Sequence, residues 1–223
     1  MRALLFIVMA SFCCLGRSEI LLSADQARVS LAGEIQVWED VSAAVGVDQV
    51  MLDSASRFKP WAKSVDYARG FSSAAIWFKF YLKNPLADPL AVLLDIPFPV
   101  LDDVKLFAVS GEGAQLLYAG GDHAPYAQRR LDISDSFVIP LKLQAGQRME
   151  YLLRVQSSSS LAVPLYVSSY SALLEQRFVK QWIQGIFYGV LVGVFLYNSL
   201  LWLSTRDHGL LFHTAHGLAI MLC

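Results

Sequence analysis

The chain has 223 residues, of which 55% are hydrophobic and 17% are charged, and its formal net charge at pH 7 is −1. Its 18 Lys and Arg are interspersed with 19 Asp and Glu, which offers no basic surface to nucleic acid, so we expect no nucleic-acid partner. Two long apolar runs, one at the amino terminus and one from residue 181, indicate a membrane protein.

Residues 1–18 have the three parts of a secretory signal peptide. Arg2 supplies a positive charge, residues 3–15 form a short apolar stretch, and residues 16–18 are small or polar, as at a signal peptidase site. We therefore expect cleavage here and export of the residues that follow. Lipidation at Cys13 or Cys14 is the disfavoured alternative, because a bulky residue would precede the modified cysteine.

Residues 19–175 are long enough for one exported domain with a hydrophobic core. They contain 13 basic and 18 acidic residues, a net charge of −5, and none of the three cysteines. Since a domain without cysteine has no disulfide, its stability must come from packing.

Short β-rich runs separated by turn residues fill most of this domain. The runs are Ser73–Leu82, Leu90–Ile96, Val104–Val109, Gln115–Ala119, Ser136–Leu141, Glu150–Val155 and Leu165–Ser168. Short strands without helical crossovers predict a mainly β fold, an antiparallel jelly-roll-like β-sandwich. One short helix is expected where Val47, Val50 and Met51 recur at helical spacing.

The second apolar run predicts a transmembrane α-helix after the sandwich. Helical periodicity begins at Tyr170, and residues 176–205 are interpreted as a linker helix and first span, because Ile183 to Leu203 can cross about 30 Å of hydrocarbon. Residues 208–223 become apolar again. The last fifteen residues make only about 22 Å of helix, so we expect the chain to stop inside a truncated second span.

Small residues mark one face of the first span. Gly185, Gly189 and Gly193 are four residues apart, a spacing that lets another helix approach closely, although glycine is also generally common in membrane helices. Asn198, at membrane depth, is expected to face protein rather than lipid. We predict a helix-packing face for these four residues.

Five segments in order resemble one known family. They are Trp77–Phe80 ahead of Asn84, Leu101–Phe107, Gly121–Arg129, Arg154–Ser158 before Pro164, and Gly185–Val190 followed by Tyr197–Leu200. Together they resemble the type-2 extracellular domain and the first membrane helix of bacterial seven-transmembrane receptors with diverse intracellular signalling modules.

The resemblance implies a periplasmic jelly-roll-like domain related to carbohydrate-binding modules, seven membrane helices and a cytoplasmic output such as a diguanylate cyclase or histidine kinase. The chain departs from this pattern by ending after about one and a half spans. The downstream signalling module is therefore expected to be missing.

Aromatic residues in one predicted strand are the first candidates for a ligand site. Alternation places Trp77, Lys79 and Tyr81 on one face of the strand, and the opposite, wholly apolar face is expected to form the core. Trp77 and Tyr81 could then form an exposed platform for a sugar ring or cover a second packing surface. The packing interpretation is favoured because Trp is usually buried.

A glycine-initiated loop, residues 121–130, is the second candidate. Asp122, His123, Arg129 and Arg130 bring a carboxylate, an imidazole and two guanidiniums within ten residues, and guanidinium groups suit bidentate capture of an anion. With the two aromatic residues they predict a site for a small carbohydrate or carboxylate ligand. The alternative is that Asp122 and Arg129 form a structural ion pair.

No catalytic residue, metal site or cofactor is predicted. The sequence has no Gly-x-Ser-x-Gly, no Gly-rich phosphate loop and no His-Glu-x-x-His, so we expect no enzyme. His213 and His216 lie three residues apart on one face of the second apolar segment and could bind a metal or relay a proton. The favoured alternative is that the helix is incomplete and that one hydrogen-bonded histidine accounts for the same pattern.

These patterns together predict the ligand-sensing periplasmic domain of a signal-transduction receptor in the bacterial inner membrane, with the amino-terminal domain in the periplasm. The alternative is a membrane-tethered carbohydrate-binding or adhesion module without signalling.

Overall fold

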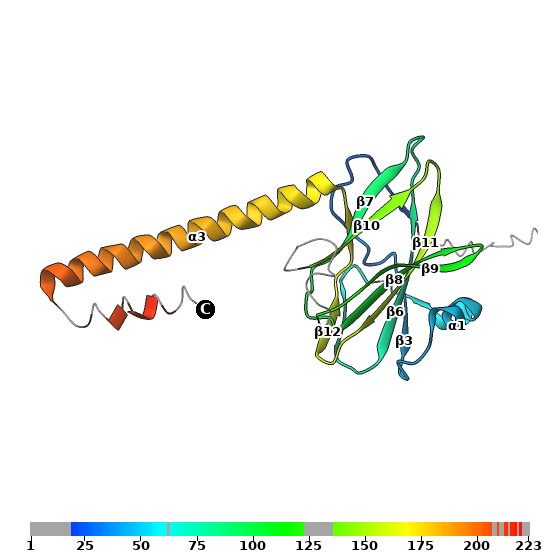
Figure 1. Ribbon diagram of the computed structural model, residues 1–223, viewed down its shortest axis with the longest axis horizontal. Coiled ribbons are helices and arrows are strands. Elements are labelled where there is room, and N and C mark those ends of the chain that lie inside the picture. The colour runs from blue at the N-terminus through cyan, green and yellow to red at the C-terminus, as the bar shows by residue number, and fades with distance from the viewer. Residues whose placement is uncertain are drawn as a thin grey trace, which may run out of the picture. The chain divides into compact units, whose positions relative to one another are not determined.

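Figure 1 shows the computed structural model, which describes residues 19–61, 63–122 and 136–206 and, beyond them, residues 209, 212–213, 215–217 and 219. The chain divides into two units between Ser169 and Tyr170. The first unit is mainly β, and the second is built on one long helix. The predicted signal peptide and most of residues 208–223 lie outside the described residues.

Within the described residues, the larger sheet has seven strands. Its order is β4 (Lys59–Pro60), β3 (Gln36–Asp40), β6 (Ala75–Lys83), β11 (Arg148–Gln156), β8 (Asp103–Ser110) and β9 (Gly113–Gly120), with β1 (Ile20–Leu21) also paired to β6. Neighbouring strands are antiparallel except for β1 and β6, which run parallel. The long apolar strands β6 and β11 therefore lie inside the sheet, and the short strand β4 forms one edge.

The remaining strands form a smaller sheet and a separate pair. The smaller sheet has the order β10 (Phe137–Leu143), β7 (Leu90–Ile96), β13 (Tyr166–Ser168) and β2 (Val29–Ser30), and the pair is β12 (Ser160–Val163) with β5 (Tyr67–Phe71). All of these pairs are antiparallel.

The main hydrophobic core combines side chains from both sheets. Ile76, Phe78, Phe80 and Leu82 of β6 are each 0% exposed, and they share one cluster with alternate residues of β7 and β10. This is the apolar face that alternation along β6 predicts. The mainly β, antiparallel, sandwich-like fold is confirmed, and the finer jelly-roll topology stays a prediction.

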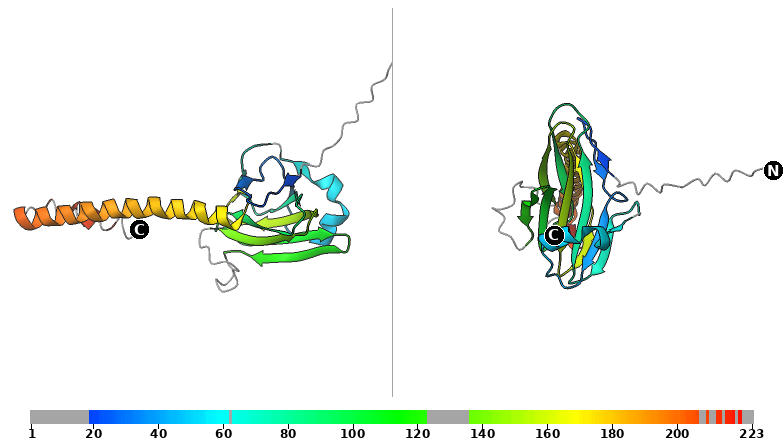
Figure 2. Two further views of the ribbon diagram at one scale, coloured as in Figure 1. Left: turned by 90° about the horizontal axis from the view of Figure 1, so that it is seen from above. Right: turned by 90° about the vertical axis from the view of Figure 1, so that its right-hand side faces the viewer.

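A second, smaller cluster lies on the other face of the larger sheet. Trp77 and Leu152 of that sheet pack there against Val50 of α1 (Val47–Leu52) and against Phe58, which follows α2 (Ser54–Arg57). Figure 2 shows α1 beside the larger sheet. The short helix expected near Val47 is confirmed, and it covers part of this face.

The second unit begins with α3 (Tyr170–Thr205), a continuous helix of 36 residues. At 1.5 Å per residue it is about 54 Å long, more than a bilayer core requires. It is the one helix among the described residues that is long and apolar enough to cross a membrane. A Cβ atom on Gly185, Gly189 or Gly193 would meet nothing within 4 Å, so the predicted packing face, including the half-buried Asn198, stays a prediction.

Candidate functional site

Trp77 and Tyr81 are buried, with 1% and 3% of their surfaces exposed. Trp77 stacks on Phe107 with 6.1 Å between ring centroids and belongs to the cluster beneath α1. Because neither ring offers a face to solvent, the exposed aromatic platform considered for this strand is wrong and the packing interpretation of Trp77 is correct. Trp77 and Tyr81 are therefore packing residues and not part of a ligand surface.

Ionic contacts fill the part of this face around Tyr81. Lys79 pairs with Glu150 across the strands at 3.1 Å. The guanidinium of Arg148 lies 4.2 Å from the centre of the Tyr81 ring, and its Nε donates to Glu19 at 2.8 Å. These contacts cover the ring with protein groups.

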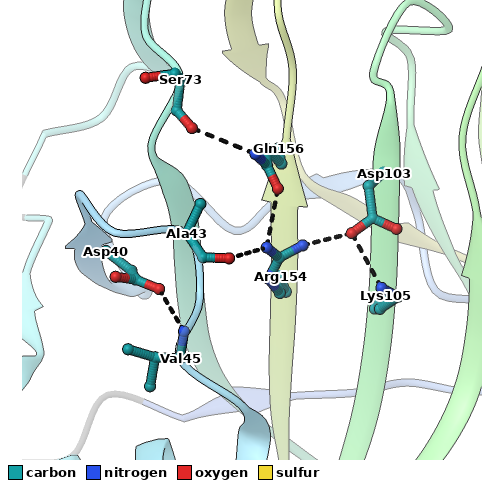
Figure 3. A network of polar contacts seen from close by, with 8 residues as sticks. All are labelled: Asp40, Ala43, Val45, Ser73, Asp103, Lys105, Arg154 and Gln156. Atoms are coloured by element: carbon teal, nitrogen blue, oxygen red, sulfur yellow. Dashed lines mark hydrogen bonds and ion pairs between the residues drawn. The ribbon is translucent and has the colours of Figure 1, made fainter.

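A polar network centred on Arg154 closes the neighbouring part of the face (Figure 3). Arg154 is 9% exposed and pairs with Asp103, and its Nη2 donates to the carbonyl of Ala43 and to Gln156 Oε1, both at 2.9 Å. Asp103 also pairs with Lys105 at 3.2 Å. The network thus ties the segment between β3 and α1 to β11 and β8, which is a structural role.

Asp40 fixes the start of the same segment. Burial of its carboxylate acts to raise the pKa, but hydrogen bonds from the Ser42 hydroxyl and from the backbone N–H groups of Val45, Ser42 and Ala43 outweigh burial, and the pKa of Asp40 is lowered. The ionised form is therefore the form that holds this turn.

The second candidate loop starts at a tightly packed glycine. A Cβ atom on Gly121 would lie 1.8 Å from the carbonyl oxygen of Asp102, so the backbone approaches too closely for any other residue. Asp122 is exposed, and its N–H donates to the carbonyl of Leu101 at 2.8 Å. His123, Arg129 and Arg130 lie outside the described residues. A ligand role for this loop stays a prediction.

A pocket of about 340 Å³ opens at the edge of the larger sheet formed by β3 and β4. Three segments that are separate in sequence meet there: β3, the stretch from the end of α2 through β4, and the start of β5. The lining residues are Val37, Trp38, Glu39, Arg57, Lys59, Pro60, Trp61 and Tyr67. We call this the edge pocket.

One wall of the edge pocket is anchored in the main core. Tyr67 is 6% exposed and meets both Phe78 and Trp61 edge to face, with ring centroids 5.2 Å and 5.0 Å apart. Trp61 is held by its indole N–H, which donates to the carbonyl of Val65 at 2.9 Å, and by its backbone N–H, which donates to Ile35 at the same distance. The half-buried Trp61 ring is therefore fixed in place.

Trp38 also lines the pocket and is half-buried, and it packs against the smaller cluster rather than the main core. It meets Phe58 edge to face at 6.4 Å, and the guanidinium of Arg57 lies 4.8 Å from its ring centre. Such a cation over a Trp face is an attractive contact. The pocket thus combines two ordered indole rings with charged groups.

The charges at the edge pocket are partly paired. Glu39 pairs with Arg69 at 3.0 Å, and Arg57 pairs with Asp53 at 2.7 Å. Lys59 is exposed and forms no ion pair with the described residues. Burial, and secondarily the negative charge of Glu39, raises the pKa of Tyr67 and keeps its hydroxyl protonated. This combination suits binding of a small molecule.

A model of the 7TMR-DISM extracellular 2 family matches residues 32–169, more than half of the chain and all of the edge pocket. The chain belongs to the 7TMR-DISM extracellular 2 family. The resemblance drawn from the sequence motifs is thereby confirmed. The family is a receptor extracellular domain and not an enzyme family, so this is a membrane protein with an outside-facing amino-terminal domain.

Three solved structures resemble this 7TMR-DISM extracellular 2 domain at a distance. One is assigned as a β-galactosidase from Bacteroides fragilis, with 8% identity, a TM-score of 0.39 and coverage of 64% of this chain and 23% of that one. A family GH115 4-O-methyl-α-glucuronidase has 12% identity, a TM-score of 0.30 and coverage of 64% and 17%. The isomalto-dextranase of Arthrobacter globiformis T6 has 9% identity, a TM-score of 0.28 and coverage of 66% and 23%.

The chain thus spans less than a quarter of each of these proteins. A comparison with curated proteins found no significant match.

Sequence reasoning missed the edge pocket of this 7TMR-DISM extracellular 2 domain. Its residues come from a strand that was not predicted, from a short edge strand and from an irregular stretch, none of which shows a periodic pattern. The available signal was weak: Trp38 and Trp61, two of the five tryptophans, each lie close to charged residues outside any predicted core strand.

Proposed function

We propose that this chain carries the ligand-sensing periplasmic domain of an inner-membrane signal-transduction receptor, and that the ligand binds in the edge pocket. The observation that carries the proposal is the pocket itself, with two half-buried indole rings and Lys59, which has no carboxylate partner among the described residues, in a receptor extracellular domain. Ligand sites are typically concave and largely apolar, with a few polar groups that fix orientation.

The order of the elements supports a sensing role. Strand β13 ends at Ser168, and α3 begins at Tyr170, so one residue separates the sandwich from a helix that is long enough to span a membrane. A ligand shifts an equilibrium only by its differential affinity for two states. Occupancy of the edge pocket would therefore have to favour one state of the strands that precede α3.

A ligand screen by thermal unfolding tests the proposal. The 223-residue chain in detergent would be melted with a panel of sugars, sugar acids, carboxylates and amino acids. We expect at least one compound to raise the Tm of the native chain, because a ligand that binds the folded state stabilises it. The same compound should have no effect on Trp61→Ala.

Phe71→Ala is the matched control, since Phe71 is an aromatic residue that is 84% exposed and does not line the edge pocket. Equal ligand-induced shifts in Trp61→Ala and Phe71→Ala would contradict binding in this pocket.

The alternative of a tethered carbohydrate-binding or adhesion module would use the same pocket without transmitting a change. Amide hydrogen exchange distinguishes the two. A sensor should show a ligand-dependent change at Tyr166–Ser168, whereas a tether should show changes confined to the pocket walls.

A further inference from the structure

We infer that the edge pocket selects an anionic ligand that contains a ring, that is, a carboxylate attached to a sugar or aromatic ring. This inference rests on the proposed function for the location of the site and adds the chemical class of the ligand.

Positive charge gathers at the pocket although the exported domain is acidic overall. Lys59 lines the pocket, and Lys63 lies beside it with its ammonium group 4.5 Å from the centre of the Trp61 ring. Neither lysine has a carboxylate partner within the part of the chain that the structure describes. Both are exposed and therefore able to reach a bound anion.

The acidic groups nearby do not offset these lysines. Glu39 is held by Arg69 at 3.0 Å, and Asp53 is held by Arg57 at 2.7 Å. Glu39 and Asp53 thus each have their own arginine, and Asp66, which precedes Tyr67, accepts from the neutral hydroxyl of Tyr166. The two lysines therefore outnumber the one nearby carboxylate that no cation among the described residues holds, and the surplus charge at the pocket is positive. A cationic ligand would meet repulsion there, and an anion would find partners.

The ring component of the ligand follows from the indole walls. Trp38 and Trp61 are half-buried and both line the pocket, so part of each indole is accessible there beside the cations of Arg57 and Lys63. Sugar rings and aromatic rings both pack on such surfaces. A ligand with a ring and a carboxylate can contact an indole wall and Lys59 together, whereas a neutral ring leaves the lysine unused.

Paired probes with the same ring test the class. Affinities of the 223-residue chain in detergent would be measured by ligand-observed NMR titration for sodium glucuronate against glucose and for sodium benzoate against benzyl alcohol. We expect one acid to bind about tenfold more tightly than its neutral counterpart, because partly exposed charge-assisted contacts give about this factor. The two pairs distinguish a sugar acid from an aromatic acid.

Lys59→Glu should weaken binding of that acid by about tenfold or more, and Lys59→Gln should have a smaller effect. Lys142→Glu is the matched control, because Lys142 is an exposed lysine on β10 of the other sheet. Equal affinities for acid and neutral probes, binding of neither acid, or equal effects of Lys59→Glu and Lys142→Glu would overturn the inference.

Failure of this inference is distinguishable from failure of the proposed function. A neutral compound that stabilises the native chain and not Trp61→Ala would overturn the anionic class while leaving the pocket as the sensing site. A ligand that raises the Tm of Trp61→Ala as much as that of the native chain would show that it does not bind in the edge pocket, and would contradict the proposed function.

Discussion

The hydroxyl of Tyr166 donates a hydrogen bond to Asp66 Oδ2 at 3.1 Å. Asp66 lies directly before Tyr67, a wall of the edge pocket, and Tyr166 begins β13, the last strand before α3. The guanidinium of Arg28 lies 3.5 Å from the centre of the Tyr166 ring. Arg28 also forms an ion pair with the buried Asp95 at 3.1 Å. One side chain therefore joins the pocket wall to the strand that leads into the membrane helix.

Tyr166→Phe should separate these two regions without disturbing the fold. The substitution removes the hydroxyl and keeps the ring beneath Arg28, so we expect a loss of about 1 kcal/mol in unfolding free energy. Ligand-dependent changes in hydrogen exchange at β13 should shrink, while ligand affinity stays within about twofold. An undiminished exchange response in Tyr166→Phe would show that this hydrogen bond does not couple the edge pocket to β13.

Trp77→Ala should cost about 3–5 kcal/mol of stability, because a fully buried indole leaves a cavity. Denaturant unfolding of the 223-residue chain measures the loss. Leu116→Ala, at a side chain that is 52% exposed, is the control and should cost much less. Similar small losses in both variants would mean that Trp77 lies at the surface.

Gly121→Ala should destabilise the end of β9, since a methyl group has no room against the Asp102 carbonyl. We expect a Tm lower by several degrees, in line with a cost of about 1–3 kcal/mol for overpacking. Gly111→Ala, where a Cβ atom would meet nothing within 4 Å, should change the Tm little. Matching Tm values for the two variants would refute the close approach.

Alkaline pH should destabilise the sandwich through Tyr151. Burial raises the pKa of Tyr151 from 10.0 to about 12, so the folded protein keeps a proton that the unfolded chain releases. The contribution of protonated Tyr151 to the free energy of unfolding is fully present below pH 10 and is lost between pH 10 and 12. The loss over this range is about 2–3 kcal/mol. Tyr151→Phe should show a shallower fall in Tm over this range, and an unchanged slope would contradict the assignment.

Much of the fold was predictable because the apolar patterns in the sequence coincide with strands in the structure. Alternation in β6 separated the core face from the face of Trp77, and the run Leu90–Ile96 is strand β7. Strands β1, β2, β3, β4, β5 and β12 were missed. They are short strands that lie at or next to a sheet edge or in a separate pair, where polar residues interrupt the apolar pattern.

The candidate site was less predictable, because it depends on contacts between distant segments. Tyr81 is covered by Arg148, which is 67 residues away in sequence. Trp77 is covered by helix α1, and the alternation of residues along a strand does not show where a helix packs. The pocket lined by Trp38 and Trp61 depends on the pairing of β4 with β3, which brings their two segments together. Pairing of such short strands is set by tertiary packing rather than by propensity.

The position of the domain outside the membrane is tested most directly by cysteine labelling in intact cells. Phe71→Cys on the sandwich and Thr205→Cys at the far end of α3 would each be made with the three native cysteines replaced by serine. A membrane-impermeant maleimide should label Phe71→Cys once the outer membrane is opened, and Thr205→Cys only after the inner membrane is also broken. Labelling of Thr205→Cys but not Phe71→Cys before that step would place the sandwich in the cytoplasm and contradict a sensor of periplasmic ligands.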